Sequence, residues 1–287
     1  MSNEILKVAI QKSGRLKEGT LELFKKCGIR IANGNDQLKA SAANFPLEVL
    51  HLRNSDIPKY LEDGVADIAV IGENTLIEKQ CDIEVLTKLG FSKCKLSLAV
   101  PKNIDYTGLN WFNDKKIATS YPNTLQGFLA EKNIQSNIHQ ISGSVEIAPN
   151  IGLAEGICDL VSSGSTLFKN GLKEVAIILE SEAVIASNKN LSNSKKEILN
   201  KLLFRVQSVL NAQNSKYILM NVPNEKIKEV TALLPVLKSP TILPLALEGW
   251  SSLHTVINEH KFWDVIDQLK GAGAEGILVV PIEKMVL

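Results

Sequence analysis

Short apolar runs alternate with helix-like patterns over the first 180 residues. The runs are rich in aliphatic and β-branched residues, which is typical of strands buried on both faces. Six strands are expected here: Leu6–Ile10, Leu47–Leu52, Ala66–Ile71, Lys95–Val100, Lys116–Ser120 and Ile157–Ser162. This alternation predicts an α/β fold with largely parallel sheets.

Three helices are expected between these strands. Leu16–Cys27 places apolar residues on one face and stops at Gly28, which favours a helix end there. The segment Ser55-Asp56-Ile57-Pro58 supplies a capping residue and an early proline, which predicts a helix start. Pro122–Lys132 predicts another helix. A break near Gly90–Lys95 separates two expected lobes, and the chain returns to the first lobe after about residue 180.

The last third of the chain has a different pattern. Residues 193–213 carry an apolar stripe at helical spacing and predict one long helix that packs between domains. Strand and helix patterns then follow in the order βαββαβ, which is typical of a ferredoxin-like unit. The expected elements are the strands Tyr217–Val222, Ser239–Leu243, Trp250–Asn258 and Glu275–Pro281, and the helices Pro223–Leu234 and Lys261–Lys270.

Length and composition narrow the class of protein. The 287 residues suit two or three domains, and 45% hydrophobic residues allow packed cores. The 32 basic and 31 acidic residues nearly balance, which argues against a general nucleic-acid binder but permits a small anion site. We expect a cytoplasmic protein, because no signal peptide or membrane span is predicted. The four cysteines lack the spacing of zinc or disulfide sites and are expected to be buried and reduced.

The first candidate anion site follows the first strand. Only four basic residues are arginines, and Arg15 and Arg53 both follow expected strands, where α/β sheets bind ligands. The loop Gln11–Leu16 also contains Lys12 and Gly14 and opens a helix, a combination that suits an anion. The alternative for each arginine is a surface ion pair.

The second candidate anion site lies between Gly156 and Leu167. A strand leads into a turn of small hydroxyl residues and then into a helix, so hydroxyl and N–H groups converge as a phosphate monoester requires. The turn residues are Ser162, Ser163, Gly164, Ser165 and Thr166. Asp159, near the strand end, suits ribose hydroxyls. The alternative is a capped helix start without a ligand.

Weaker polar loops complete the expected cleft. Glu146 follows Ser144 in a turn into a helix, where it forms either a capping box with Ser144 or Ser142, or a substrate contact. Arg53, Asp56 and Glu73 lie in other strand-end loops. Two anion subsites in one cleft suggest a substrate with phosphates at both ends. The histidines show no triad or metal spacing, and no dedicated protein metal site is assigned.

Several of these segments, in this order, resemble the ATP phosphoribosyltransferase family, which begins histidine biosynthesis. The resemblance runs from Leu6 to Met285 and rests on Gln11–Leu16, Asp56–Pro58, Glu62–Asp67, Gly143–Glu146 and Asp159–Leu167. The segments Pro240–Ile242 and Ile277–Lys284 look like the regulatory tail of the long form. Two departures are seen. Ser163 stands where the family often has Thr, and the paired acids of other phosphoribosyltransferases are reduced to Asp159.

The resemblance implies a fold and a reaction. It implies two catalytic lobes like type II periplasmic binding proteins and a C-terminal ferredoxin-like regulatory domain. We expect residues 1–94 with 181–213 to form lobe I, 95–180 lobe II, and 215–287 the histidine-binding domain. The implied reaction joins N1 of ATP to C1 of phosphoribosyl pyrophosphate in the presence of Mg²⁺, with inhibition by histidine. A dimer or hexamer is implied, without a separate regulatory subunit, nucleic acid or membrane.

The same resemblance implies a role for each candidate residue. The turn from Ser162 to Thr166 would hold the 5′-phosphate, and Asp159 the ribose hydroxyls. Lys12 and Arg15, with Mg²⁺, would hold the departing pyrophosphate. Nucleotide contacts are expected from Arg53, Asp56, Glu73 and Glu146, and histidine contacts from Leu237, Ser239, Thr241 and Gly276. A solute-binding or effector-sensing protein and a non-catalytic regulatory paralogue are the competing interpretations.

Overall fold

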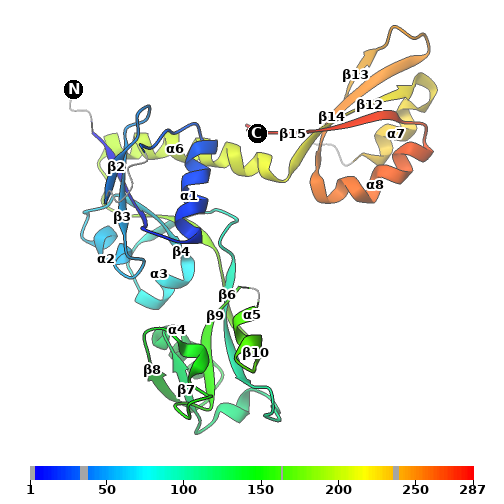
Figure 1. Ribbon diagram of the computed structural model, residues 1–287. Helices are drawn as coiled ribbons and strands as arrows, with labels where there is room; N and C mark the ends of the chain where they lie inside the picture. Colours follow the sequence, from blue (N-terminus) through cyan, green and yellow to red (C-terminus); the bar gives the residue numbers. More distant parts are fainter. Residues whose placement is uncertain (1–3, 33–37, 163, 235–238) are drawn as a thin grey trace. The chain divides into compact units, whose positions relative to one another are not determined.

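The computed structural model describes residues 4–32, 38–162, 164–234 and 239–287. The chain divides into two units, Met1–Lys25 with Ile29–Ile198 and Lys26–Gly28 with Leu199–Leu287. Within the described ranges the strands form three sheets, two in the first unit and one in the second (Figure 1). The predicted α/β class is therefore confirmed.

The first sheet, which with α1–α3 we call lobe I, has the strand order β2-β3-β1-β4-β11-β5. β1 lies at its centre, parallel to both β3 and β4, and its residues Leu6, Val8 and Ile10 are fully buried. The elements are β1 (Leu6–Gln11), α1 (Arg15–Lys26), β2 (Lys39–Ser41), β3 (Leu47–Leu52), α2 (Ile57–Glu62), β4 (Ile68–Gly72), α3 (Glu73–Lys79), β5 (Glu84–Lys88) and β11 (Ala183–Ser187).

The second sheet, which with its helices we call lobe II, has the strand order β10-β6-β9-β7-β8. Phe112, Leu125 and Cys158 are fully buried in its core. The elements are β6 (Cys94–Pro101), β7 (Lys116–Thr119), α4 (Pro122–Glu131), β8 (Asn137–Gln140), β9 (Gly156–Val161), α5 (Ser165–Lys169), β10 (Leu172–Ser181) and the 3₁₀ turns η1 (Leu109–Phe112) and η2 (Val145–Ile147).

The prediction of largely parallel sheets is wrong. Antiparallel pairs occur in both sheets, between β2 and β3, between β11 and both β4 and β5, and between β6 and both β9 and β10. Most of these pairs involve strands that the apolar pattern missed. β10 is mostly half-exposed and shifts register twice against β6, so it has no continuous apolar run.

Two chain segments connect the lobes, residues 89–93 and Glu182. Backbone hydrogen bonds join these crossings: Leu89 N donates to Ala183 O at 2.9 Å, and Ala183 N donates to Phe91 O at 3.0 Å. Gly90 N donates to the Glu182 carboxylate at 2.6 Å. The two crossings therefore form one hydrogen-bonded ribbon, and the three-part division of the chain stays a prediction.

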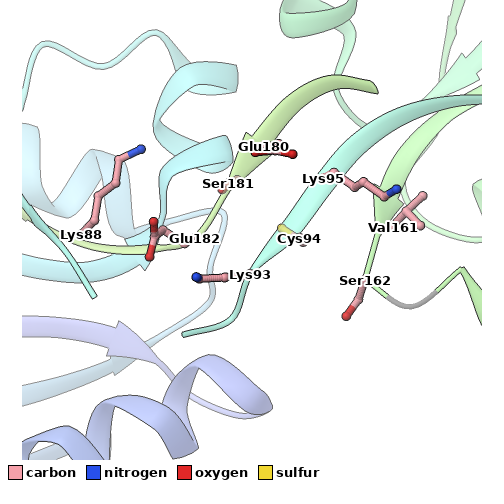
Figure 2. A pocket seen from close by; sticks show the side chains of 9 residues that line it. All are labelled: Lys88, Lys93, Cys94, Lys95, Val161, Ser162, Glu180, Ser181 and Glu182. Carbon is pink, nitrogen blue, oxygen red and sulfur yellow. The ribbon is translucent and has the colours of Figure 1, made fainter. Parts of the chain in front are cut away.

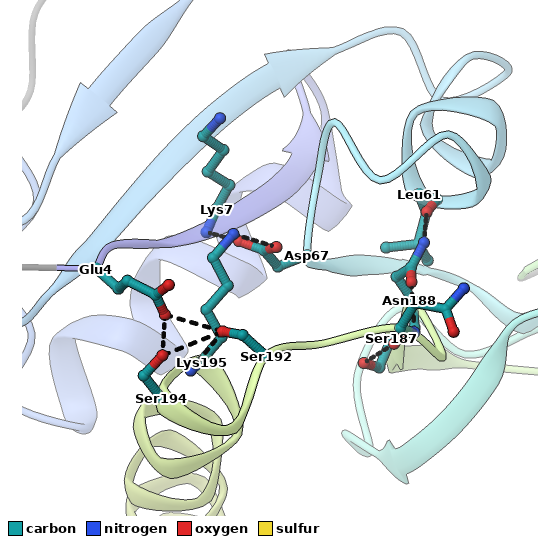
Figure 3. Close-up of polar contacts among 10 residues, drawn as sticks. Glu4, Lys7, Leu61, Asp67, Ser187, Asn188, Ser192, Ser194 and Lys195 are labelled. Atoms are coloured by element: carbon teal, nitrogen blue, oxygen red, sulfur yellow. Dashed lines mark hydrogen bonds and ion pairs between the residues drawn. The ribbon is translucent and has the colours of Figure 1, made fainter. Parts of the chain in front are cut away.

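The long helix α6 (Asn193–Gln213) has the predicted bounds. Its first turn is tied to lobe I (Figure 3). Lys195 Nζ lies 2.8 Å from Asp67, whose second carboxylate oxygen accepts the Lys7 backbone N–H at 2.8 Å. Ser192 donates to Glu4 at 2.9 Å. These contacts anchor the start of α6 to the central strand β1.

The third sheet confirms the predicted ferredoxin-like order. Its antiparallel strands lie in the order β13-β14-β12-β15, and α7 and α8 cover one face (Figure 1). Ile218, Met220 and Val222 alternate along β12 and form the core with these helices. The elements are β12 (Ser215–Pro223), η3 (Asn224–Lys226), α7 (Ile227–Leu233), β13 (Thr241–Pro244), β14 (Trp250–Asn258), α8 (Glu259–Gly271) and β15 (Glu275–Pro281).

Local predictions at helix ends have mixed outcomes. Gly28 has a positive φ of 72°, and Ile29 N donates to Phe24 O, which confirms the end of α1. Pro223 ends β12 and does not begin the following helix. Asp56 precedes α2 but makes no capping hydrogen bond, and its carboxylate accepts from Ser55 Oγ. None of the helices in the described part of the chain is long and apolar enough to cross a membrane.

Candidate functional site

Lys12 lies exposed in the turn between β1 and α1, and Arg15 is the exposed first residue of α1. Gly14 between them has a φ of 89°, a conformation that glycine adopts without steric cost. The Lys12 backbone N–H donates to Leu52 O at 2.8 Å, which ties this turn to the end of β3. Over the described ranges neither cation has an ion pair, so both are available to an anion.

Arg53 and Asp56 are exposed in the next strand-end turn, where Asp56 N donates to Arg53 O at 3.0 Å. Arg53, like Arg15, forms no ion pair with the residues that the structure describes. Glu73 behaves differently, because its carboxylate lies 2.9 Å from Lys88 Nζ. One oxygen of the Glu73 carboxylate is therefore already paired with a cation.

Asp159 lies in β9 of lobe II and is half-buried. Burial raises the pKa of Asp159, the hydrogen bond from the Leu160 N–H opposes this shift, and the charge of Glu146 adds to it. The charge of Glu146 thus acts against ionisation of Asp159. The two candidates come from different elements of lobe II, Asp159 from β9 and Glu146 from η2. Ser144 makes no side-chain cap at η2, so the capping-box alternative is wrong for Ser144.

The hydroxyl-rich turn connects β9 to α5. Ser162 is exposed at the end of β9, and Ser165 and Thr166 are exposed in the first turn of α5. Gly164 has a φ of 73°, and its carbonyl accepts the Phe168 N–H at 3.0 Å. Ser163 lies outside the described residues. Apart from Ser163, the turn is a tight glycine-based connection with hydroxyls at its surface.

A pocket lies beside this turn at the crossing between the lobes (Figure 2). Ser162 is the one sequence-predicted site residue in its described lining. Lys88, Lys93 and Lys95 contribute three cations and Glu180 and Glu182 two anions. Lys88 pairs with Glu73 and Lys95 with Glu174, whereas Lys93 pairs with no described carboxylate. Lys93 is a cation near the candidate turn that the sequence did not single out.

Polar contacts between the lobes were also missed from the sequence. Asn74 Nδ2 donates to the Tyr121 hydroxyl at 3.2 Å, and Ser181 donates to Asn74 Oδ1 at 2.9 Å. Burial, and then the nearby Asp159 charge, raise the pKa of Tyr121 to about 12. The phenol therefore stays protonated at neutral pH and is no general base. These residues carry no motif that would have marked them.

The cysteines and carboxylates limit the chemistry of the site. Cys27 and Cys158 are buried as expected, but Cys81 and Cys94 are partly exposed, so the expectation of four buried thiols is wrong. Burial raises the pKa of all four thiols, which disfavours thiolate nucleophiles. The described residues contain no group of three or more His, Cys, Asp or Glu arranged to hold a metal ion.

The histidine candidates lie in the second unit. Ser239 and Thr241 are exposed at the start of β13, Gly276 lies in β15, and Leu237 falls outside the described residues. β13 and β15 are the two edges of the sheet, so three strand spacings, about 14 Å, separate Thr241 from Gly276. The sheet of one chain does not bring these two residues together, and the histidine contacts stay a prediction.

The sequence matches known proteins over nearly its whole length. A family model described as ATP phosphoribosyltransferase matches residues 53–208, and one described as HisG, C-terminal domain, matches residues 212–284. An ATP phosphoribosyltransferase of Cytophaga hutchinsonii is 56% identical over 98% of this chain and 99% of its own. One of Phocaeicola vulgatus is 54% identical over 99% of this chain and 100% of its own.

Solved structures support the same relationship. A chain of the ATP phosphoribosyl transferase (HisG:HisZ) complex from Thermotoga maritima aligns with a TM-score of 0.63 at 29% identity, covering 72% of this chain and 99% of that one. A histidine kinase sensor domain with similarity to periplasmic binding proteins aligns with a TM-score of 0.50 at 12% identity, covering 74% and 95%. The second match concerns the fold alone and agrees with the expected two-lobed architecture.

Proposed function

Because the chain belongs to the ATP phosphoribosyltransferase family and is thus a pentosyltransferase, we propose that it catalyses the first step of histidine biosynthesis. In this reaction N1 of the ATP adenine attacks C1 of phosphoribosyl pyrophosphate. The C1–N1 bond forms, the bond from C1 to the pyrophosphate oxygen breaks, and the products are 1-(5-phosphoribosyl)-ATP and diphosphate. The match over 98% of the chain to a 56% identical relative carries this proposal.

The proposed roles follow from where charge develops. The breaking bond leaves positive charge on the ribose and negative charge on pyrophosphate, so positioning and electrostatics supply most of the catalysis. Lys12 and Arg15, exposed and unpaired among the described residues, neutralise the pyrophosphate. The Asp159 carboxylate accepts hydrogen bonds from the ribose hydroxyls. These bonds replace the hydrogen bonds to water that the carboxylate loses through burial. The repulsion between Asp159 and Glu146 is relieved as positive charge grows on the ribose.

The remaining groups bind the two substrates. The turn Ser162–Thr166 holds the 5′-phosphate through hydroxyls and the backbone around Gly164. Arg53, Asp56, Glu73 and Glu146 contact the nucleotide. The neutral N1 of adenine has a free lone pair, so no strong general base is needed, and the protonated Tyr121 phenol agrees with this.

Mg²⁺ is the expected cofactor. It binds through one or two carboxylates together with substrate phosphates, and it keeps several waters. Asp159 and Glu146 are two candidate carboxylates of lobe II that would hold the ion together with the substrate phosphates, although the described residues contain no group of three or more potential metal ligands. When bound, the ion supplies positive charge to the pyrophosphate.

The activity is tested by mixing ATP, phosphoribosyl pyrophosphate and Mg²⁺ and following the ultraviolet absorbance of the adenine adduct. Arg15→Ala should lower kcat/KM by about 10²-fold, the scale of losing a charge contact in the transition state. Arg30→Ala is the matched control, because Arg30 is exposed but lies beyond α1, away from the strand-end turns. Near-normal activity of Arg15→Ala would refute the assignment.

Regulation by histidine and assembly into dimers or hexamers belong to the same proposal. The ferredoxin-like sheet leaves Leu243, Leu278 and Val280 exposed on its edge strands, as an interaction surface would. The Thermotoga maritima structure is a complex of two kinds of chain, and this chain covers 99% of the aligned one. This chain carries an additional C-terminal sheet of its own, so we propose that it needs no separate regulatory subunit.

A further inference from the structure

The first turn of α4 is capped by a residue of the other lobe. The residue at its own N-cap position, Tyr121, makes no capping hydrogen bond, and Pro122 follows it. The N–H groups of Asn123 and Thr124 would therefore lack partners within the helix. Glu78, at the end of α3 in lobe I, supplies them.

Four hydrogen bonds join Glu78 to this turn. Asn123 N donates to the carboxylate at 3.1 Å, and Thr124 donates through its N at 2.9 Å and through its Oγ1 at 2.8 Å. Asn123 Nδ2 donates to the Glu78 backbone carbonyl at 2.9 Å. Glu78 is only 6% exposed, so the three bonds to its carboxylate are charge-assisted bonds in a desolvated place. The positive end of the α4 dipole favours the same carboxylate.

A second contact lies on the same face of α3. Asn74 and Glu78 are four residues apart, so their side chains share one helix face. Asn74 contacts Tyr121 just before α4, at 3.2 Å, and is itself held by Ser181. α3 thus contacts the start of α4 through Asn74 at its own beginning and through Glu78 near its own end. This contact is separate from the two chain crossings and restrains the movement that a two-segment connection would permit.

The candidate site is divided between the two lobes that this contact joins. Lys12 and Arg15 lie on lobe I, whereas Asp159 and the turn at Gly164 lie on lobe II. We propose that Glu78 is a positioning residue, which holds the lobes in the arrangement that binds both substrates by capping α4. The positioning role rests on the proposed function, whereas the interlobe cap does not.

The cap is tested first without any activity. Hydrogen exchange of the full chain, followed by mass spectrometry on peptides covering residues 120–130, should be about tenfold faster at the start of α4 in Glu78→Gln. Glu131→Gln, which removes an exposed charge from the same helix, should leave exchange there unchanged. Equal exchange in Glu78→Gln and the unmodified protein would overturn the cap.

The positioning role is tested by kinetics. Because fewer molecules would have the lobes correctly placed, Glu78→Gln should raise the KM of both substrates about tenfold while kcat changes less than about threefold. A fall in KM, an unchanged KM, or a loss confined to kcat would each overturn the positioning role. If the unmodified protein shows no activity, the proposed function and this role both fail, and the exchange experiment still decides the cap.

Thr124→Val provides a second test of the proposal in case Glu78→Gln does not fold. It keeps the helix N–H and the Glu78 charge but removes one hydroxyl bond. It should shift exchange and KM in the same direction as Glu78→Gln, by a smaller factor. Unchanged exchange and KM in a folded Thr124→Val, with Glu78→Gln unfolded, would overturn the proposal.

Discussion

Asp159 is an ionisable residue in a half-buried position, and burial opposes ionisation of its carboxylate. Its carboxylate is half-buried, the charge of Glu146 adds to the rise of its pKa, and the one hydrogen bond described for it comes from the next residue along the chain, Leu160. Such a group costs stability when ionised, because burial removes water and the neighbouring charge repels it. A substrate that brings hydroxyl donors and positive charge offsets both effects, as the proposed ribose contact would.

Asp159→Asn should therefore separate stability from activity. Because the folded pKa of Asp159 is raised, the cost of ionisation appears as pH rises through the unfolded pKa and is complete above the folded one. The variant should melt at a higher temperature than the unmodified protein at pH 7, with this advantage lost below about pH 4. Its kcat/KM should fall about 10²-fold.

Thermal melts at pH 7 and below about pH 4, together with the ultraviolet absorbance assay of the adenine adduct, check this expectation. Asp105→Asn is the matched control, since it removes an exposed carboxyl from the same lobe. A lower melting temperature of Asp159→Asn at pH 7 would contradict the stability argument, and full activity would contradict the ribose contact.

At the scale of the element, the connection between β9 and α5 depends on backbone conformation. Gly164 has a left-handed φ of 73°, and apart from its chain neighbours no atom of the described residues lies within 4 Å of the position that a Cβ would take. Gly127 has equally open surroundings, but it lies inside α4 without a positive φ. The two glycines therefore differ in conformation and not in available space.

Replacing each glycine by alanine should have opposite effects. Gly164→Ala should destabilise the protein by about 1 kcal/mol, since a Cβ disfavours the left-handed region. It should also raise the KM for phosphoribosyl pyrophosphate, because the turn changes shape. Gly127→Ala should stabilise the protein by about 0.5–1 kcal/mol through helix propensity. Denaturant unfolding of both variants tests this, and equal effects on stability would show that φ is not the cause.

At the scale of the whole molecule, the division into two units separates the proposed catalysis from its regulation. The first unit contains Lys12, Arg15, Asp159 and the turn at Gly164, whereas the second contains the four-stranded sheet. Regulation across such a division requires that histidine bind one assembly state or lobe arrangement more tightly than another.

Deleting residues 215–287 should abolish inhibition by histidine while activity remains. The cut keeps α6 complete, including the contact of Arg205 with Cys27 O, and removes the hydrogen bonds of Met285 to Ser208 and Asn211. Initial rates at increasing histidine concentration test this, with circular dichroism as the control for folding. A truncated protein that histidine still inhibits would place the regulatory site elsewhere.

The sequence by itself determined the elements with strong local signals. The strand Leu47–Leu52, the helix of 193–213 and the strand Trp250–Asn258 all have their predicted bounds. The order βαββαβ and the strand-end location of Lys12 and Arg15 also followed from local pattern. Each of these signals is local, because it lies within one continuous segment of the chain.

Only the tertiary structure decided the direction of strand pairing and the meeting of distant polar groups. β10 pairs antiparallel with β6, and β11 pairs antiparallel with β4. Both pairings arise because the chain crosses between the lobes twice, which no single segment encodes. The Glu78 cap on Asn123 and Thr124 joins residues from separate segments, and the charge that adds to the rise of the Asp159 pKa comes from Glu146 in another segment. Such an interaction depends on the distance between two side chains in the folded chain. The local sequence pattern does not determine that distance when the two residues are far apart in the sequence.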